Sequence, residues 1–277
     1  GFLDLGFELQ GNYDILFVNE FHKAFNDVYQ YARRNMHLPE PLYGHHVENI
    51  MHYVDGQHPE MLQNLINLVN ESKVHDLTGF IGGPPCPDFS VAGKNRGKDG
   101  DNGKLSQTYA DLICHVRPDF FLFENVKGLY RTARHRAFFE QMKQQFRDNG
   151  YSLTERLINS LEYGAPQDRD RIILIGFSQQ TIDALHLPSA DFVLQRFPWQ
   201  QHIEYDLEVV KQLPWPKKTP YHEGVPTEMP EGIIEELTIM HWWNVNDVTH
   251  HPNSNMYFQP RAGIRRFTTK DEGDDEK

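Results

Sequence analysis

The chain has 277 residues, a formal net charge of −12, 39% hydrophobic residues and only two cysteines. This length and apolar content predict a folded protein with one large domain and a smaller one. Two cysteines exclude a disulfide framework and a cysteine-rich zinc site, and no run approaches the about 18 apolar residues that a membrane span needs. We therefore expect a cytoplasmic protein with no membrane segment and no bound metal.

The acidic balance of the chain argues against a polyanionic partner without excluding one. Five of the 39 acidic residues lie within positions 271–277, a stretch that we expect to be disordered. Local basic patches, rather than net charge, decide whether a protein contacts phosphates. Nucleic acid therefore stays among the candidate partners.

The first eighty residues alternate helical and strand-like segments. Residues 1–11 are typical of a short helix, and the apolar run 13–18 predicts a strand that Asn19 and Glu20 close. A helix is expected over about 21–34, another over 61–69, and a buried strand over 77–81. An acid between a strand and a helix, such as Glu20, is where nucleotide-binding α/β proteins hold a ribose diol.

Residues 80–90, FIGGPPCPDFS, hold one cysteine on a turn of small and rigid residues. The prolines on both sides of Cys86 fix φ, and the two glycines let the chain turn where it leaves the strand. This composition indicates a thiol held still at a strand end, although an incidental buried cysteine is the alternative. The glycine-rich stretch 93–104 that follows is interpreted either as a mobile lid over the thiol or as a plain surface loop.

The next segments bring further chemical groups to strand ends. A helix is expected over 105–116 and an apolar strand over 117–123, which runs into Glu124. After a helix over 135–149 and a strand over 151–157, the segment 167–171, QDRDR, enters the apolar strand 172–177. Arg169 and Arg171 are two positions apart and should share one face of that strand, where two guanidinium groups suit an anionic or carbonyl-bearing ligand.

The alternation up to residue 177 predicts an α/β fold: a doubly wound, mostly parallel sheet with helices on both faces and ligands at the carboxyl ends of the strands. Residues 178–277 are rich in Pro, Trp and His and lack this alternation. They predict a smaller domain of irregular and β structure. Its mixture of basic and aromatic residues is compatible both with nucleic-acid contact and with an ordinary solvated surface.

Three motifs taken together, GGPPCPDFS at 82–90, ENV at 124–126 and QDRDR at 167–171, resemble the cytosine carbon-5 DNA methyltransferase family in order and spacing. The resemblance covers residues 1–177. It implies a Rossmann-like class I methyltransferase fold with a target-recognition domain in 178–277. It also implies S-adenosylmethionine as the cofactor and double-stranded DNA as the partner of a monomeric enzyme.

The resemblance also implies roles for four residues. Cys86 would be the nucleophile that adds to carbon 6 of a flipped-out cytosine. Glu124 would hold and protonate ring nitrogen 3, Arg169 would help position the base and that carboxylate, and Arg171 would organise the site. Because a free thiol is mostly protonated at neutral pH, the nucleophile would need nearby positive charge or a proton relay.

The cofactor pocket implied by the resemblance has a ribose side, an adenine side and a glycine turn. Glu20 matches the acid on the ribose hydroxyls and Phe21 the aromatic against adenine, while Asn49 stands where the family usually has Asp. The full set is Gly1, Phe2, Glu20, Phe21, Asn49, Ile50, Pro85 and Leu105.

The chain also departs from the family pattern. It begins at what looks like the last glycine of the first motif, Phe-x-Gly-x-Gly-Gly, and no Gly-Asn-(Ser/Ala)-Val-Pro motif follows. These departures predict a fragment that binds the cofactor poorly on its own.

The sequence also bears on three other functions. A tRNA cytosine methyltransferase would show a Cys-Phe-Thr signature, yet no cysteine follows Cys114. A non-catalytic regulatory module is disfavoured because the chain retains all four expected catalytic residues, Cys86, Glu124, Arg169 and Arg171. A thiol hydrolase needs a base histidine in a defined setting, and His115 belongs to no motif.

Overall fold

The structure is a computed structural model that describes residues 2–85, 101–131, 133–186, 197–213 and 234–250. The α-helices in these ranges are α1 (Phe2–Glu8), α2 (Lys23–Asn35), α3 (Pro59–Ser72), α4 (Asp101–Val116), α5 (Lys127–Arg131), α6 (Ala133–Asp148), α7 (Gln179–Ala184), α9 (Leu207–Gln212) and α10 (Ile239–Val245). The 3-10 helices are η1 (Ile50–Tyr53), η3 (Ser160–Tyr163), η4 (Glu235–Leu237) and η5 (Val248–His250). The strands are β1 (Val18–Asn19), β2 (His45–His46), β3 (Gly79–Gly82), β4 (Phe120–Val126), β5 (Tyr151–Asn159) and β6 (Asp170–Ser178).

The chain divides into two compact units. The first comprises Gly1–Ile158 and Asp170–Trp199, and the second comprises Asn159–Arg169 and Gln200–Lys277. These units are defined by packing. The expected division into a catalytic part, 1–177, and a recognition part, 178–277, concerns function and stays a prediction.

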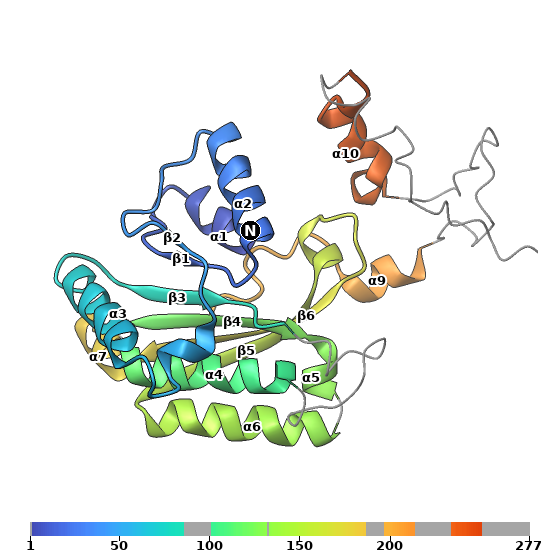
Figure 1. The fold of residues 1–277 in the computed structure, drawn as a ribbon. Helices are drawn as coiled ribbons and strands as arrows, with labels where there is room; N and C mark the ends of the chain where they lie inside the picture. Colours follow the sequence, from blue (N-terminus) through green and yellow to red (C-terminus); the bar gives the residue numbers. More distant parts are fainter. Residues whose placement is uncertain (1, 86–100, 132, 187–196, 214–233, 251–277) are drawn as a thin grey trace, which may run out of the picture. The chain divides into compact units, whose positions relative to one another are not determined.

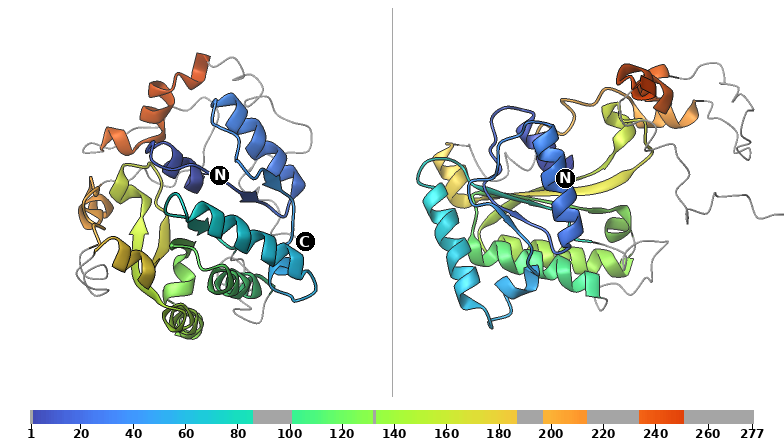
Figure 2. Two further views of the ribbon diagram at one scale, coloured as in Figure 1. Left: turned by 90° about the vertical axis from the view of Figure 1, so that its left-hand side faces the viewer. Right: turned by 45° about the horizontal axis from the view of Figure 1, so that its top comes forward.

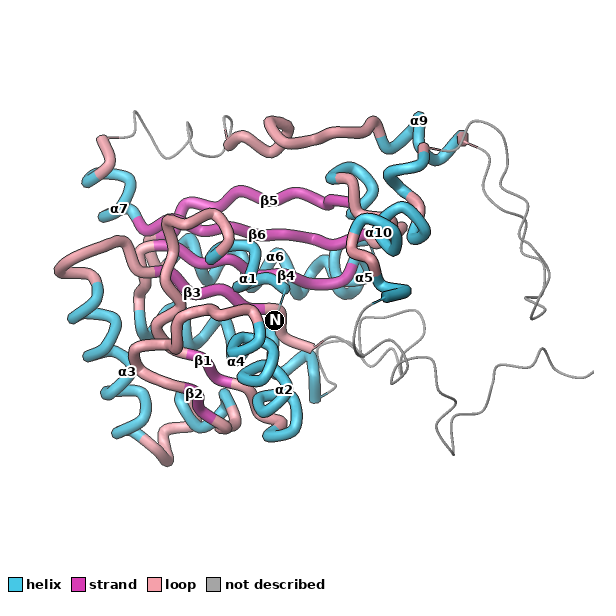
Figure 3. The backbone as a smooth tube through the Cα atoms, turned by 90° about the horizontal axis from the view of Figure 1, so that it is seen from above, coloured by secondary structure: helices cyan, strands magenta, loops and turns pink. Residues whose placement is uncertain are grey.

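A four-stranded sheet forms the centre of the first unit, in the order β3-β4-β6-β5 (Figure 3). β3 runs parallel to β4, with Gly79 opposite Phe120, whereas β6 runs antiparallel to β4, with Glu124 opposite Ile173. The α/β class is confirmed, but this sheet is mixed rather than mostly parallel. The cause is the connection 160–169 between β5 and β6, which is too short for the crossover helix that a parallel return needs.

A separate pair of parallel strands, β1 and β2, places Val18 opposite His45. The strand expected over 13–18 is therefore much shorter in the structure. A strand is defined by its pairing, and β2 offers partners only to the last residues of this apolar run. β1 still ends directly before Glu20, and β2 ends at His46, shortly before Asn49.

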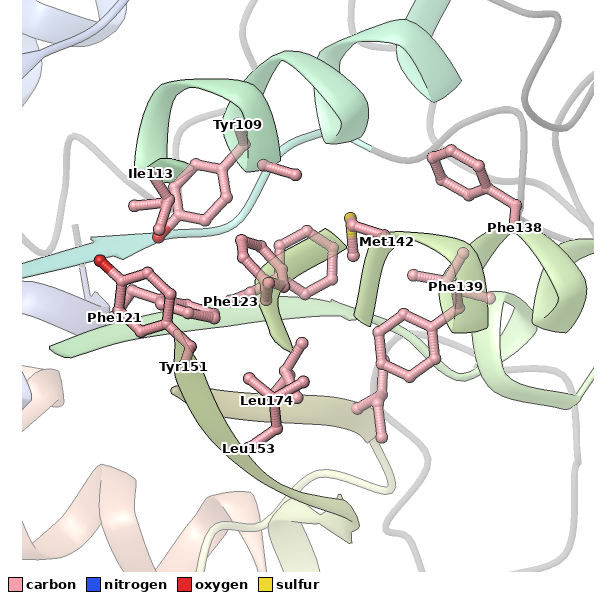
Figure 4. Packing of buried hydrophobic residues seen from close by; sticks show 14 residues of the cluster. Tyr109, Ile113, Phe121, Phe123, Phe138, Phe139, Met142, Tyr151, Leu153 and Leu174 are labelled. Carbon is pink, nitrogen blue, oxygen red and sulfur yellow. The ribbon is translucent and has the colours of Figure 1, made fainter. Parts of the chain in front are cut away.

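Helices α4 and α6 lie side by side along one face of the four-stranded sheet, and α1 contacts β3 from the other side (Figures 1 and 2). Figure 4 shows Tyr109 and Ile113 of α4, and Met142 of α6, pointing toward the strands. Phe121 and Phe123 of β4 are fully buried beneath them. Most of the apolar area buried in this unit therefore supports β4 and the strands beside it.

The first unit has a second, smaller cluster, in which η1 and α3 pack against α4. Helix α3 begins at Pro59, whose fixed φ suits a first helical turn. Its buried residues Leu65 and Val69 meet Tyr53 of η1 and Leu112 of α4. This cluster fixes the chain between β2 and β3 in place.

The second unit has a capped turn and short helices. Asn159 accepts a hydrogen bond from Leu161 N while Glu162 accepts from Asn159 N, so the start of η3 is closed from both sides. In the described part of residues 178–277 the regular elements are helical. The β structure expected for this part of the chain is not found in its described residues. The acidic end, 271–277, lies outside them. Among the described helices, none is long and apolar enough to cross a membrane.

Candidate active site

The carboxyl ends of β3 and β4 form the candidate active site. Because the two strands are parallel, their ends meet at the same edge of the sheet, where α/β proteins place their ligands. Gly83, Pro84 and Pro85 continue from β3 at this edge, and Glu124 lies on β4. Cys86, the expected nucleophile, follows Pro85 directly and lies outside the described residues, as does the expected lid.

Glu124 lies close to the backbone of the β3 extension. A Cβ atom on Gly83 would lie 2.8 Å from Oε2 of Glu124, so a side chain at this position would collide with the carboxylate. The next residue, Asn125, is buried, and its Nδ2 donates to Pro84 O at 3.4 Å while its Oδ1 accepts from Val126 N at 2.8 Å. The segment that leads to Cys86 is thus tied to the strand that carries the acid.

The Arg171 guanidinium holds the Glu124 carboxylate. Nε of Arg171 lies 2.7 Å from Oε1 of Glu124, and the two side chains are 20% and 29% exposed. The sheet register explains the pair: Glu124 is opposite Ile173, and Arg171, two residues before Ile173, is its diagonal neighbour on the same face. A partly buried, charge-assisted hydrogen bond of this kind orients the carboxylate strongly.

Arg169 lies outside the strand that carries Arg171. It is exposed, belongs to the second unit and precedes β6, and its carbonyl accepts from Ser160 N at 3.1 Å. Arg171, which the resemblance assigns to organising the site, holds the carboxylate, and the part in positioning the base and the carboxylate that it assigns to Arg169 stays a prediction. The expectation that both arginines share a face within the strand is wrong, because β6 begins at Asp170. An antiparallel register between β4 and β6 was the signal that sequence reasoning lacked.

Sequence reasoning also missed a second ion pair at this edge. Lys127, the first residue of α5, pairs with Asp170, the first residue of β6. Asp170 lies between the two arginines of the QDRDR motif, and Lys127 directly follows the ENV motif. The opposite charges of these two residues are the signal from which an ion pair could have been predicted. The pair fastens the start of β6 to the end of β4 next to Glu124.

The other cysteine, Cys114, is unsuited to nucleophilic chemistry. Burial raises the pKa of its thiol to about 11, and nearby Asp111 acts in the same direction. A thiol with so high a pKa is almost entirely protonated at neutral pH. His115, the histidine considered for a hydrolase, donates from Nδ1 to Asp111 O within its own helix at 2.6 Å.

The ends of β1 and β2 bring the cofactor-side candidates together. Asn19 Nδ2 donates to Glu48 O and Asn19 Oδ1 accepts from Glu48 N, both at 3.1 Å, so the chain after β1 is joined to the chain after β2. Glu20 N donates to His46 O at the same edge. Glu20 and Asn49, which the sequence assigns to one pocket, are thereby held on neighbouring strand ends.

The side chains at this edge suit a nucleoside. The Glu20 carboxylate accepts from His22 N at 2.9 Å through one oxygen, and the ring of Phe21 is 59% exposed beside it. Ile50 packs against both hydrophobic clusters and offers an apolar edge. Asn49 Oδ1 is committed to Met51 N, which caps η1. An acid, an open aromatic face and an apolar wall are the groups that a ribose and an adenine need.

The remaining described residues that are expected at the cofactor lie after β3 and in helices α1 and α4. Pro85 is exposed after β3, and Leu105 is half-buried in α4. Phe2 starts α1, and Gly1 lies outside the described residues.

Comparison with known proteins explains why these groups occur together. The family model of C-5 cytosine-specific DNA methylases matches residues 48–237, which include the segment of Cys86 as well as Glu124 and Arg171. The chain belongs to this family. The sequence-based resemblance to cytosine carbon-5 methyltransferases is thereby confirmed.

Several curated relatives of this methylase domain are Type II methyltransferases. The chain is 51% identical, over all of its length and 62% of the relative, to Type II methyltransferase M.NmeDI of Neisseria meningitidis serogroup C. It is 39% identical, over 41% of its length and 34% of the relative, to M.MthTI of Methanothermobacter thermautotrophicus. The chain thus spans about three fifths of the first relative's length and one third of the second's.

A solved structure of similar fold is the Dnmt2 methyltransferase of S. pombe. The likeness has a TM-score of 0.42 at 17% identity and covers 64% of this chain and 47% of the other.

Proposed function

We propose that the protein transfers a methyl group from S-adenosylmethionine to carbon 5 of cytosine in double-stranded DNA. One observation carries the proposal: Arg171 holds the Glu124 carboxylate next to Gly83. Cys86 follows Gly83 by three residues in the sequence. An acid and a thiol at one strand edge are what this reaction needs, because one must polarise a pyrimidine ring and the other must attack it.

In the proposed chemistry the Cys86 thiolate forms a bond to carbon 6 of the cytosine while Glu124 donates a proton to ring nitrogen 3. Carbon 5 then becomes nucleophilic and accepts the methyl group, which the cofactor supplies when bound. Loss of the carbon-5 proton to water reforms the double bond between carbons 5 and 6 and expels the thiolate, while nitrogen 3 returns its proton to Glu124. Arg171 keeps the carboxylate aimed at nitrogen 3, and Arg169 helps to position the base and that carboxylate.

The cytosine has to leave the duplex for this reaction. Carbon 6 is covered by neighbouring bases in stacked DNA, so the enzyme must extrude the nucleotide at a cost of about a few kcal/mol. We assign the catalytic steps to residues 1–177 and the recognition of the DNA sequence to residues 178–277.

The cofactor would be held by the ends of β1 and β2. Glu20 has one carboxylate oxygen on His22 N, which leaves the other to accept from a ribose hydroxyl. Phe21 has an open ring face for adenine, and Ile50 lines the apolar edge. The Asn49 oxygen is engaged in its cap, so the amide nitrogen is the group that remains for the adenine edge.

The names of the curated relatives support a place in a bacterial modification system. M.NmeDI is named a Type II methyltransferase, and its similarity to this protein extends over the whole of this chain. We therefore infer a DNA-modifying enzyme that accompanies a restriction activity, acting as a monomer in the cytoplasm.

Methyl transfer can be tested directly. Duplex DNA and, separately, total tRNA are incubated with the full-length protein and S-adenosylmethionine carrying a tritiated methyl group, then digested to nucleosides. The proposal predicts label in 5-methyldeoxycytidine from DNA, absent with Cys86→Ser. Label in 5-methylcytidine from tRNA would instead support the RNA enzyme, and label in an N-methylated base would contradict the chemistry.

A further inference from the structure

Tyr109 of α4 is a buried tyrosine that joins the two strands of the candidate active site. It is 5% exposed, and its hydroxyl donates to Leu122 O of β4 at 2.9 Å. Phe80 O of β3 lies 3.4 Å from the same hydroxyl and is the weaker acceptor. One side chain therefore contacts both strands just before they reach Gly83 and Glu124.

The ring of Tyr109 also fixes the last residue of β3. A Cβ atom on Gly82 would lie 2.6 Å from Cε2 of Tyr109, closer than carbon atoms can approach. Glycine is needed at position 82 because the ring occupies the space of a side chain. Figure 4 shows the ring between α4 and the strands, where its centroid lies 5.8 Å from that of the Phe123 ring.

The hydroxyl is a permanent donor. Burial, and secondarily the charge of Tyr151, raise the pKa of Tyr109 far above its ordinary value. The phenol therefore keeps its proton at neutral pH. An O–H group inside a packed cluster is strongly favoured to retain an acceptor, because an unpaired one is costly.

We propose that Tyr109 is a positioning residue that sets where the β3 extension lies relative to the Glu124 carboxylate. The ring against Gly82 and the hydroxyl on Leu122 O hold Gly83 next to Oε2 of Glu124, and the chain reaches Cys86 three residues later. The functional part of this inference rests on the proposed methyl transfer. Misplacement of reacting groups by about 1 Å costs on the order of a hundredfold in rate.

The chain offers a matched control in Tyr151. It is 4% exposed, and its hydroxyl donates to Pro118 O at 2.7 Å, near the opposite end of β4. Tyr151→Phe and Tyr109→Phe each remove one buried hydroxyl from its principal acceptor, a backbone carbonyl of Pro118 or Leu122. Their effects on thermal unfolding should be similar, while their effects on the site should differ.

The first readout needs no activity. Hydrogen exchange is followed by mass spectrometry on peptides spanning residues 79–86, in which Pro84 and Pro85 carry no amide. Tyr109→Phe should speed exchange at Gly82 and Gly83 by about tenfold, and Tyr151→Phe should leave it unchanged. Equal exchange in the two variants would overturn the positioning role, and this comparison decides the matter even if the protein forms no adduct with DNA.

The second readout is the rate of covalent adduct formation with 5-fluorocytosine DNA. Tyr109→Phe should slow it about tenfold at unchanged DNA affinity, and Tyr151→Phe should not. Gly82→Ala should slow it as well, and adding Tyr109→Leu, which removes the ring in contact with residue 82, should recover part of the loss. Losses that simply multiply in the double variant would show that the two residues do not act through one contact and would refute the inference.

Discussion

Replacing Arg171 by Gln should slow adduct formation while leaving the fold intact. The Nε–Oε1 distance is 2.7 Å, and both side chains are partly buried. A hydrogen bond between charged groups contributes about 1.5–3 kcal/mol. Partial exposure reduces this to about 1–2 kcal/mol. Since about 1.4 kcal/mol corresponds to a tenfold rate change, the variant should react roughly five to thirty times more slowly.

The assay is the single-turnover rate of covalent adduct formation with 5-fluorocytosine DNA, measured beside DNA affinity. Arg171→Lys keeps the charge but not the geometry of the fork, so it should fall between the wild type and Arg171→Gln. Arg136→Gln is the control, because Arg136 pairs with Glu140 only at 4.0 Å on an exposed helix face. Wild-type rates in Arg171→Gln, or an equal loss in Arg136→Gln, would refute the role given to the ion pair.

Three further predictions follow from the packing and the charges. Phe121→Ala removes a fully buried ring whose centroid lies 4.3 Å from that of Phe146, and urea unfolding should show a loss of about 3–5 kcal/mol; a loss below about 1 kcal/mol would contradict this packing. Glu8→Gln leaves the Arg33 guanidinium, whose side chain is 3% exposed, without its carboxylate partner, and the free energy of unfolding should fall by about 3–5 kcal/mol. Asp27→Asn, which breaks the exposed ion pair with Lys23, should change it by almost nothing. The rate of Cys114 alkylation in the folded protein should be low at pH 8 and rise with pH up to about 11, because the raised pKa of this thiol leaves little thiolate at lower pH. Rapid alkylation at pH 8 would contradict the burial of Cys114.

The strand ends were predictable because apolar runs and motif order are local properties of the sequence. The run before Glu20 is apolar whatever its partner, so the position of that acid just after β1 followed from the sequence alone. The apolar run before Glu124 likewise predicted a strand leading into that acid, but β4 continues past it to Val126. The motif trio then identified the family, which the matched residues 48–237 confirm.

Strand direction and side-chain pairing were not predictable in the same way. The placement of Arg171 on Glu124 depends on β6 running antiparallel to β4, which is set by a short connection and by long-range register. The length of β1 likewise depends on a partner 27 residues away, since Val18 pairs with His45. Tyr109 carries no motif, and only its contacts with Gly82 and Leu122 reveal it.

The most direct test of the account is covalent trapping on DNA. The full-length protein is mixed with S-adenosylmethionine and duplex DNA in which 5-fluorocytosine replaces cytosine throughout, so that the recognition sequence need not be known. Because the fluorine cannot leave as a proton does, the account predicts a denaturation-resistant protein–DNA adduct attached at Cys86, lost in Cys86→Ser and slowed in Glu124→Gln. Absence of the adduct in a folded, DNA-binding protein, or its persistence in Cys86→Ser, would contradict the account.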